Sequence, residues 1–323
     1  MGSMRAVSLL GIVALSALCA CGSAGGTDDP LADAAGAGGS AGGSAGGSGG
    51  ASGANGGGAG TGINTGGSGS GAGADCGGDV SKAIYVVASP ENMLLSFDPV
   101  KLTFTQIGKL ACSKNGSTPF SMAVNRAGVA YVLYDDGNIY KASTKDASCT
   151  SSGYKPNQQG WSTFGMGYVS DSAGSSAETL FVMDGSTGSG KGLGYISASG
   201  ALTPVGQFDK LAGRSGEVTG TGDGKLFGFF VDITDASKTT VAEVEKTNAK
   251  ILSDVKQGLP AINAWAFAHW GGSFYLFNGT GSEPSRVNKY TPGKGTTLVV
   301  PNAGYRIVGA GVSTCAPTVE PPK

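Results

Sequence analysis

The side chains that could do chemistry in this sequence are few and far apart. The chain has one histidine, His269, and no Cys-x-x-Cys pair, so it lacks the residue sets of common zinc sites and of histidine-dependent catalytic triads. Residues 232–235 lack the glycine and the terminal glutamate of an EF-hand loop. The Gly-rich run over residues 185–194 is not followed by the Lys-Ser/Thr of a phosphate-binding loop. We therefore expect neither a metal nor a cofactor.

The remaining polar and aromatic side chains favour binding over catalysis. Acid–base hydrolysis of glycosides generally uses two placed carboxylates, and Glu217 is the one acid in the segments that we expect to be innermost in the fold. Asp135-Asp136 and Glu243/Glu245 are expected in a hairpin turn and on a third strand, where they face solvent. The candidate binding residues are Glu217, Asn263, Trp265, His269, Trp270 and Arg306. For Glu217, Trp265 and His269 a purely structural role stays open as the alternative.

An internal repeat supplies the elements that must position these residues. Five segments share an apolar–aromatic–apolar pattern, with aromatic centres at positions 85, 131, 181, 227 and 275. A small-residue segment precedes four of the copies, and further extended segments follow, giving four strands per repeat of about 48 residues. That unit is typical of a β-propeller blade. The alternative is a β-sandwich with accidental spacing, which would give no reason for an even period. We predict an all-β, five-bladed β-propeller.

The two ends of the repeat region are each incomplete. The first copy, residues 83–87, lacks the small-residue strand that should precede it. The chain ends with such a strand, residues 306–312, which has no continuation. Pairing the two segments would complete the fifth blade and remove two exposed strand edges. We therefore expect the N- and C-terminal strands of the domain to close one blade together.

Four cysteines follow this topology. Cys76, Cys112, Cys149 and Cys315 permit three connectivities. Cys76 and Cys315 flank the two strands that should close the ring, whereas Cys112 and Cys149 each follow the outer region of adjacent blades. Because an exported protein permits disulfides, we expect the bonds Cys76–Cys315 and Cys112–Cys149.

The N-terminus indicates export. Arg5 supplies a positive start, and residues 6–18 are uncharged and largely apolar, a run too short to span a bilayer comfortably. The sequence Leu18-Cys19-Ala20-Cys21-Gly22 resembles the lipobox of bacterial lipoproteins. The resemblance implies that residues 1–20 are a signal peptide and that acylated Cys21 holds the chain on a lipid bilayer. Gly22, in place of an Asp that favours inner-membrane retention, implies the outer membrane of a Gram-negative host. The alternatives are an ordinary cleaved signal or a plain membrane anchor.

Residues 21–75 are expected to be a disordered tether. They repeat Gly, Ser and Ala, and the only charges between Gly22 and Ala74 are Asp28, Asp29 and Asp33. Such a stretch cannot bury enough apolar surface to fold, and Gly/Ser chains behave as flexible coils. The propeller is then residues 76–323. Because the net charge is −1 and no basic stripe is present, we expect no nucleic-acid partner.

The layout of lipobox, Gly/Ser-rich tether and Cys-bracketed propeller resembles the uncharacterised lipoproteins of myxobacterial genomes, in which residues 120–124 and 308–315 look like recurring elements. The resemblance implies a lipid-anchored protein of the bacterial cell envelope and transfers no catalytic residue. Our leading expectation is a binding module for an envelope protein or a glycan. The alternatives are a glycoside hydrolase or lyase acting at the channel mouth, and a structural component of an envelope assembly.

Overall fold

The computed structural model describes residues 76, 78–185, 190–232, 234–235, 238–260 and 263–322. The predicted signal peptide, Cys21 and the Gly/Ser tether lie outside these residues, so they stay predictions, as do the predicted domain boundaries. In the described ranges, two short 3-10 turns, η1 (Gly78–Lys82) and η2 (Gln158–Gly160), are the helical elements. No helix in this part of the chain is long and apolar enough to cross a membrane.

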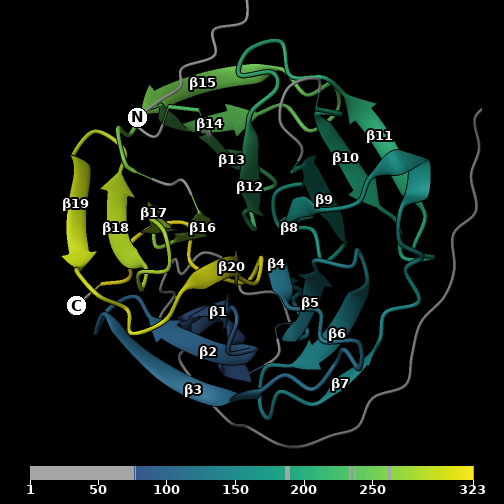
Figure 1. The fold of residues 1–323 in the computed structure, drawn as a ribbon. Helices are drawn as coiled ribbons and strands as arrows, with labels where there is room; N and C mark the ends of the chain where they lie inside the picture. The colour runs from purple at the N-terminus through teal and green to yellow at the C-terminus, as the bar shows by residue number, and fades with distance from the viewer. Residues whose placement is uncertain are drawn as a thin grey trace, which may run out of the picture. The chain divides into compact units, whose positions relative to one another are not determined.

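The described residues form five antiparallel four-stranded sheets arranged as a ring (Figure 1), which confirms the five-bladed β-propeller. Blade 1 consists of β20 (Ile307–Gly311), β1 (Ile84–Ala88), β2 (Met93–Asp98) and β3 (Thr103–Lys109). Blade 2 consists of β4 (Pro119–Val124), β5 (Val129–Tyr134), β6 (Ile139–Ser143) and β7 (Cys149–Ser151). Blade 3 consists of β8 (Phe164–Ser170), β9 (Glu178–Asp184), β10 (Leu193–Ile196) and β11 (Leu202–Gly206). Blade 4 consists of β12 (Ser215–Gly220), β13 (Leu226–Val231), β14 (Thr239–Val244) and β15 (Ile251–Lys256), and blade 5 of β16 (Ala264–Trp270), β17 (Ser273–Gly279), β18 (Arg286–Thr291) and β19 (Gly295–Val300).

Burial falls from the inside of each blade to its outer edge. The repeated apolar–aromatic segments are the second strands, and β1 and β17 are buried at every position. Such strands are covered on both faces by neighbouring blades, which is why their apolar residues run continuously instead of alternating. The outermost β15 is exposed at every position after Ile251. The hydrophobic core therefore lies between the blades, as where Phe97 of blade 1 contacts Phe277 of blade 5 with ring centroids 5.6 Å apart.

The innermost strands approach one another too closely for ordinary side chains. A Cβ added at Gly167 of β8 would lie 2.6 Å from the carbonyl oxygen of Val218 on β12, and one at Gly309 of β20 would lie 2.7 Å from the amide nitrogen of Met122 on β4. Real Cβ atoms do not come this close to backbone. The small residues of the inner segments are thus what allows five strands to surround a narrow axis.

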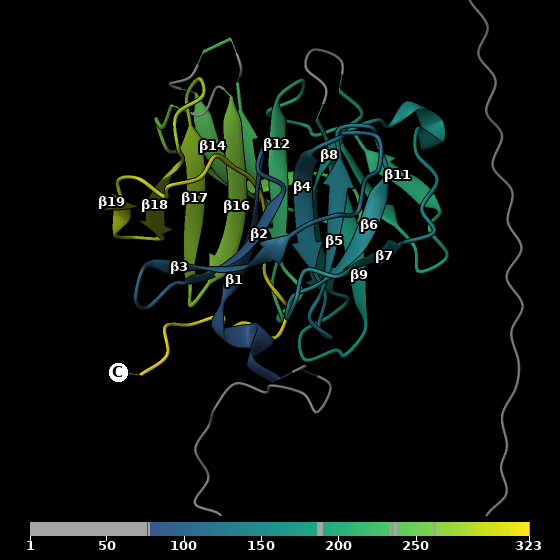
Figure 2. The same ribbon diagram turned by 60° about the horizontal axis from the view of Figure 1, so that its bottom comes forward.

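Ring closure uses both ends of the domain, as predicted. β1 pairs antiparallel with β20, with Val86 opposite Ala310 and Tyr85 opposite Gly311. The Cys76–Cys315 disulfide lies just outside this pair, and the Cys112–Cys149 disulfide connects blades 1 and 2, so both predicted bonds are confirmed. Figure 2 shows the dark-blue turn η1 and the yellow C-terminal segment on the same side of the ring, which we call the lower face.

The fourth strand of blade 2 is the short β7 (Cys149–Ser151). Tyr154 follows this strand and is buried between blades 2 and 3. Asn263 and Arg306 each stand one residue before an inner strand instead of on it. Both differences arise because strand ends depend on backbone pairing, which side-chain pattern reports only indirectly.

The two disulfides are expected to differ in their effect on stability. Cys76 and Cys315 are separated by 239 residues in sequence, and Cys112 and Cys149 by 37. In the chain-entropy model, losing the disulfide that closes the longer loop costs about 5–6 kcal/mol, which exceeds the cost of losing the other disulfide by about 1–2 kcal/mol. We expect the Cys76→Ser/Cys315→Ser variant to unfold at lower urea concentration than Cys112→Ser/Cys149→Ser. An equal loss, or a larger loss for the second variant, would contradict the closure role.

Candidate functional site

The first candidate site is a cavity of about 200 Å³ at one mouth of the central channel, which we call the mouth pocket. The lining residues that matter here are Thr118, Asp135, Glu217, Asn263, Trp265 and Arg306. They come from the beginnings of the inner strands of blades 2, 4, 5 and 1, and from the β5–β6 turn. Four of the six predicted binding residues therefore meet in one place.

Parallel inner strands explain this convergence. A Cβ at Gly165 would meet Glu217, one at Gly167 would meet Thr219, and one at Gly220 would meet Tyr168, so β8 and β12 advance in the same direction. The same holds for β20 and β4, since Gly309 faces Ser121 and Gly311 faces Val124. Inner strands that run in parallel begin on one face of the ring, and residues at their starts come together there. This upper face is opposite the lower face defined above.

Glu217 is the buried centre of this region. Its side chain, on β12, is 2% exposed. Its Oε2 accepts hydrogen bonds from the Ser121 hydroxyl of blade 2 at 2.8 Å and from the Met166 amide of blade 3 at 3.1 Å. One side chain thus connects the inner strands of three blades.

Burial sets the protonation state of this carboxyl. Removal from water raises the pKa of Glu217 well above its usual range, and the hydrogen bonds from Ser121 and Met166 lower it in part. Burial therefore extends the pH range over which Glu217 stays protonated, and a protonated carboxyl can donate a hydrogen bond as well as accept one. Glu217 can therefore serve the pocket as a donor or as a proton source, while it also holds three blades together.

Arg306 and Asn263 form the polar rim. Arg306 is half-buried, and its guanidinium donates a hydrogen bond to the backbone carbonyl of Asn263. The side-chain oxygen of Asn263 accepts from the amide of Gly281 at 2.6 Å, which ties the start of β16 to the β17–β18 turn. The guanidinium keeps further donors for a ligand, because it has five N–H groups.

Trp265 supplies the aromatic wall of the mouth pocket. It is half-buried and packs partly against the apolar cluster between blades 4 and 5. A structural role and a binding role are therefore compatible, because the core holds one part of the side chain while another part lines the pocket. Aromatic faces of this kind bury a large area with little loss of side-chain freedom.

Asp135 is the residue that sequence reasoning discounted. It is exposed, as expected of a hairpin residue, but it also lines the mouth pocket. Its two carboxylate oxygens accept hydrogen bonds from the amide and the hydroxyl of Thr118, each at 3.1 Å. The blade topology could have located Asp135. In an antiparallel blade, the turn after the second strand lies on the same face as the beginning of the inner strand.

His269 and Trp270 are not part of the mouth pocket. They stand at the far end of β16, and both are buried. Trp270 donates from its indole nitrogen to the carbonyl of Ser81 at 2.9 Å and so fixes η1 to the lower face. Burial lowers the pKa of His269 to about 4, which leaves the imidazole neutral at physiological pH.

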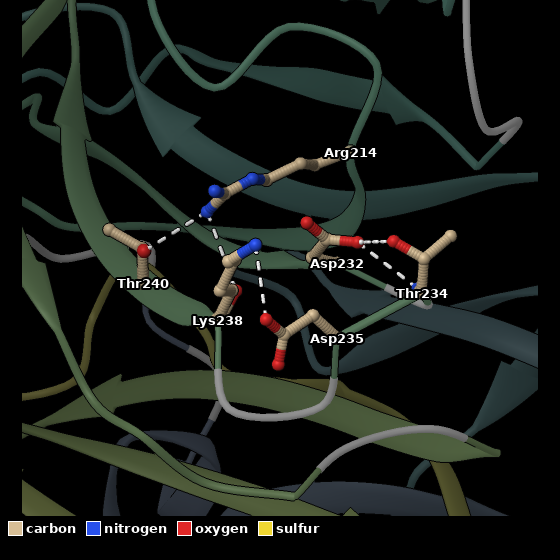
Figure 3. A network of polar contacts seen from close by, with 6 residues as sticks. All are labelled: Arg214, Asp232, Thr234, Asp235, Lys238 and Thr240. Atoms are coloured by element: carbon tan, nitrogen blue, oxygen red, sulfur yellow. Dashed lines mark hydrogen bonds and ion pairs between the residues drawn. The ribbon is translucent and has the colours of Figure 1, made fainter.

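Charged and polar side chains of blade 4 form a network in which the groups bond one another (Figure 3). Asp232 accepts from the hydroxyl and the amide of Thr234, while Lys238 forms an ion pair with Asp235 at 3.0 Å. The Arg214 guanidinium donates to Thr240 at 3.3 Å. These contacts brace the β13–β14 connection and do not create a binding site. Over the described residues, no group of three or more His, Cys, Asp or Glu could hold a metal ion.

The fold and the mouth pocket define the chain as a five-bladed β-propeller with polar and aromatic groups at the upper end of its channel. No protein-family profile matches the chain, and no curated protein matches it. Among solved structures, a calcium-binding regucalcin of Agrobacterium tumefaciens str. C58 is 14% identical, with a TM-score of 0.37 over 74% of this chain and 72% of that one. A Bacteroides thetaiotaomicron protein of unknown function is 14% identical, with a TM-score of 0.42 over 68% and 60%. Dihydro-heme d1 dehydrogenase NirN is 11% identical, with a TM-score of 0.33 over 69% and 44%. Similarities this weak say nothing about ligand or activity.

The raised pKa of Glu217 makes stability depend on pH. When a carboxyl holds its proton more tightly in the folded state than in the unfolded one, the free energy of unfolding of the protein falls as pH rises above the unfolded pKa. The fall is at most about 1.4 kcal/mol per pH unit. Glu217→Gln keeps an acceptor for Ser121 and Met166 but cannot ionise. We expect the free energy of unfolding of the wild type, relative to this variant, to fall between about pH 5 and the raised pKa. Urea titrations along this range measure it, and Asp254→Asn, at an exposed site, is the control. Parallel pH profiles for wild type and Glu217→Gln would contradict the assignment.

Proposed function

We propose that the propeller is a binding module whose mouth pocket takes a protein or glycan ligand. The observation that carries the proposal is the convergence of Trp265, Arg306 and Glu217 from three inner strands on one cavity. Concave sites with an aromatic wall and a few placed polar groups are typical of ligand binding. The rim guanidinium and the neutral acid can each donate a hydrogen bond to a carbonyl or hydroxyl oxygen.

A glycoside hydrolase or lyase is the second candidate, because Asp135 and Glu217 line the same cavity. Two carboxyl groups that flank the scissile bond are the pair that glycosidic bond cleavage uses. However, both oxygens of Asp135 are engaged by Thr118, and Glu217 is buried and bonded to two other blades. These contacts favour binding over turnover. A purely structural role in an envelope assembly is the third candidate.

The location that we propose is the bacterial cell envelope, with the chain held on the bilayer by an acylated Cys21, on the outer membrane. The lipobox-like sequence supports this proposal. One acyl chain gives marginal membrane binding, whereas the two or three chains of a lipoprotein give durable attachment.

Binding at the mouth pocket is tested with full-length protein carrying Cys21→Ala, used in pull-downs from envelope extracts and on a glycan array. We expect one ligand class to be retained, and Trp265→Ala or Arg306→Ala to weaken its binding at least about tenfold. Lys256→Ala, on the exposed outer strand of blade 4, is the control. A ligand retained equally by all variants would place binding elsewhere. Glycan cleavage that both Glu217→Gln and Asp135→Asn abolish would favour the enzyme.

Lipidation is tested separately, by labelling cells with radioactive palmitate and fractionating them. We expect the wild type to carry label and to sediment with outer membranes, and Cys21→Ala to lose both properties. Cys19→Ala is a matched control two residues away and should keep the label. Label that survives in Cys21→Ala, or that Cys19→Ala removes, would contradict the assignment of Cys21.

A further inference from the structure

A second and larger cavity, of about 440 Å³, opens between blades 4 and 5, and we call it the interblade cleft. Its functional lining consists of Asp223, Lys225, Phe227, Glu243, His269 and Tyr290. These residues come from the turn between β12 and β13, from β13 and β14, and from β16 and β18. The cleft falls within the size range of small-ligand pockets.

His269 is the unusual group in this cleft. It is 7% exposed, and its backbone amide donates to the Thr219 hydroxyl at 3.2 Å. Its ring lies nearly parallel to that of Phe227, with centroids 6.1 Å apart, and edge-on to that of Phe274 at 5.1 Å. No hydrogen bond joins either ring nitrogen to another residue in the described part of the chain. The ring nitrogens are not among the fully buried side-chain atoms that lack a partner, so they reach the solvent of the cleft and are open to a ligand.

The charges around the cleft nearly cancel. Lys225 and Glu243 face each other across β13 and β14, with Nζ and Oε1 3.9 Å apart. Asp223 adds one negative charge, and its carboxylate raises the pKa of His269 against the larger lowering effect of burial. With the imidazole neutral, the cleft has no net positive charge with which to attract a phosphate or a carboxylate.

Hydroxyl-rich ligands match these groups. A neutral imidazole donates from one nitrogen and accepts at the other, as a sugar hydroxyl also does. Phe227 is half-buried and lines the cleft, so the exposed part of its ring can pack against the C–H groups of a pyranose. Asp223 and Glu243 add acceptors at the rim, and Lys225 adds a donor.

We propose that the interblade cleft is a binding site for a neutral saccharide, with His269 as its buried hydrogen-bonding group and Phe227 as its stacking surface. The site is separate from the mouth pocket, since Trp265 and His269 stand near opposite ends of β16. The proposal therefore does not depend on the function proposed for the upper face.

The test uses His269 as its own reporter, because it is the one histidine in the sequence. In protein labelled with ¹³C-histidine and carrying Cys21→Ala, the imidazole Cε1–H group gives one assigned signal. Cellotriose, maltotriose and N-acetylchitotriose are titrated as neutral probes, with trigalacturonate and a chitosan trimer as charged ones. We expect at least one neutral trisaccharide to shift this signal, and the charged probes to act more weakly. No shift with any neutral probe, or a stronger response to a charged one, overturns the proposal.

Variants localise the response. We expect Phe227→Leu to weaken binding at least about tenfold, consistent with the loss of an aromatic anchor. Asp223 is exposed, so Asp223→Asn tests the rim without risk to the core and should weaken binding several-fold. Trp265→Ala should leave the shift unchanged. If Trp265→Ala abolishes the response and both cleft variants preserve it, the saccharide binds at the mouth pocket and the proposal is wrong.

Discussion

The pairing of β1 with β20 is the constraint on which the remaining structure depends. Blades 2 to 5 are each built from consecutive strands, but blade 1 is complete only when the two ends of the domain meet. Each blade buries its faces against two neighbours, so an open ring would expose apolar surface on both flanking blades as well as two strand edges. The Cys76–Cys315 bond stabilises this pairing because it lowers the conformational entropy of the unfolded chain.

The close approach of the inner strands at the channel axis has a second effect, because it limits where polar side chains can stand. Inner strands rich in glycine leave little room for side chains, and the one acid among them, Glu217, reaches two other blades. On β16, the two side chains that line the cavities stand near the ends of the strand. Trp265 accordingly lies at the upper end of β16, and His269 lies toward its lower end.

Periodicity made the fold predictable, whereas the site was predictable only in part. Evenly spaced aromatic centres and an orphan strand at residues 306–312 report the blades and their closure directly. The grouping of residues into sites depends on strand direction and length, which local sequence does not show. His269 and Trp270 were listed with Trp265 as candidate binding residues, yet they stand at the opposite end of β16, away from the mouth pocket. Asp135 was set aside as a turn residue because nothing local shows which face a turn opens on.

The covalent link beside the closing strands also affects how the domain responds to tension. Cys76 is bonded to Cys315, so a pull on the chain ahead of Cys76 reaches both terminal strands of blade 1 together. Without that bond, the same pull would reach β1 alone and could strip it from β20 and β2 one residue at a time. With it, the two strands resist as a unit, and the domain should withstand a pull that would otherwise unravel the ring from its first strand.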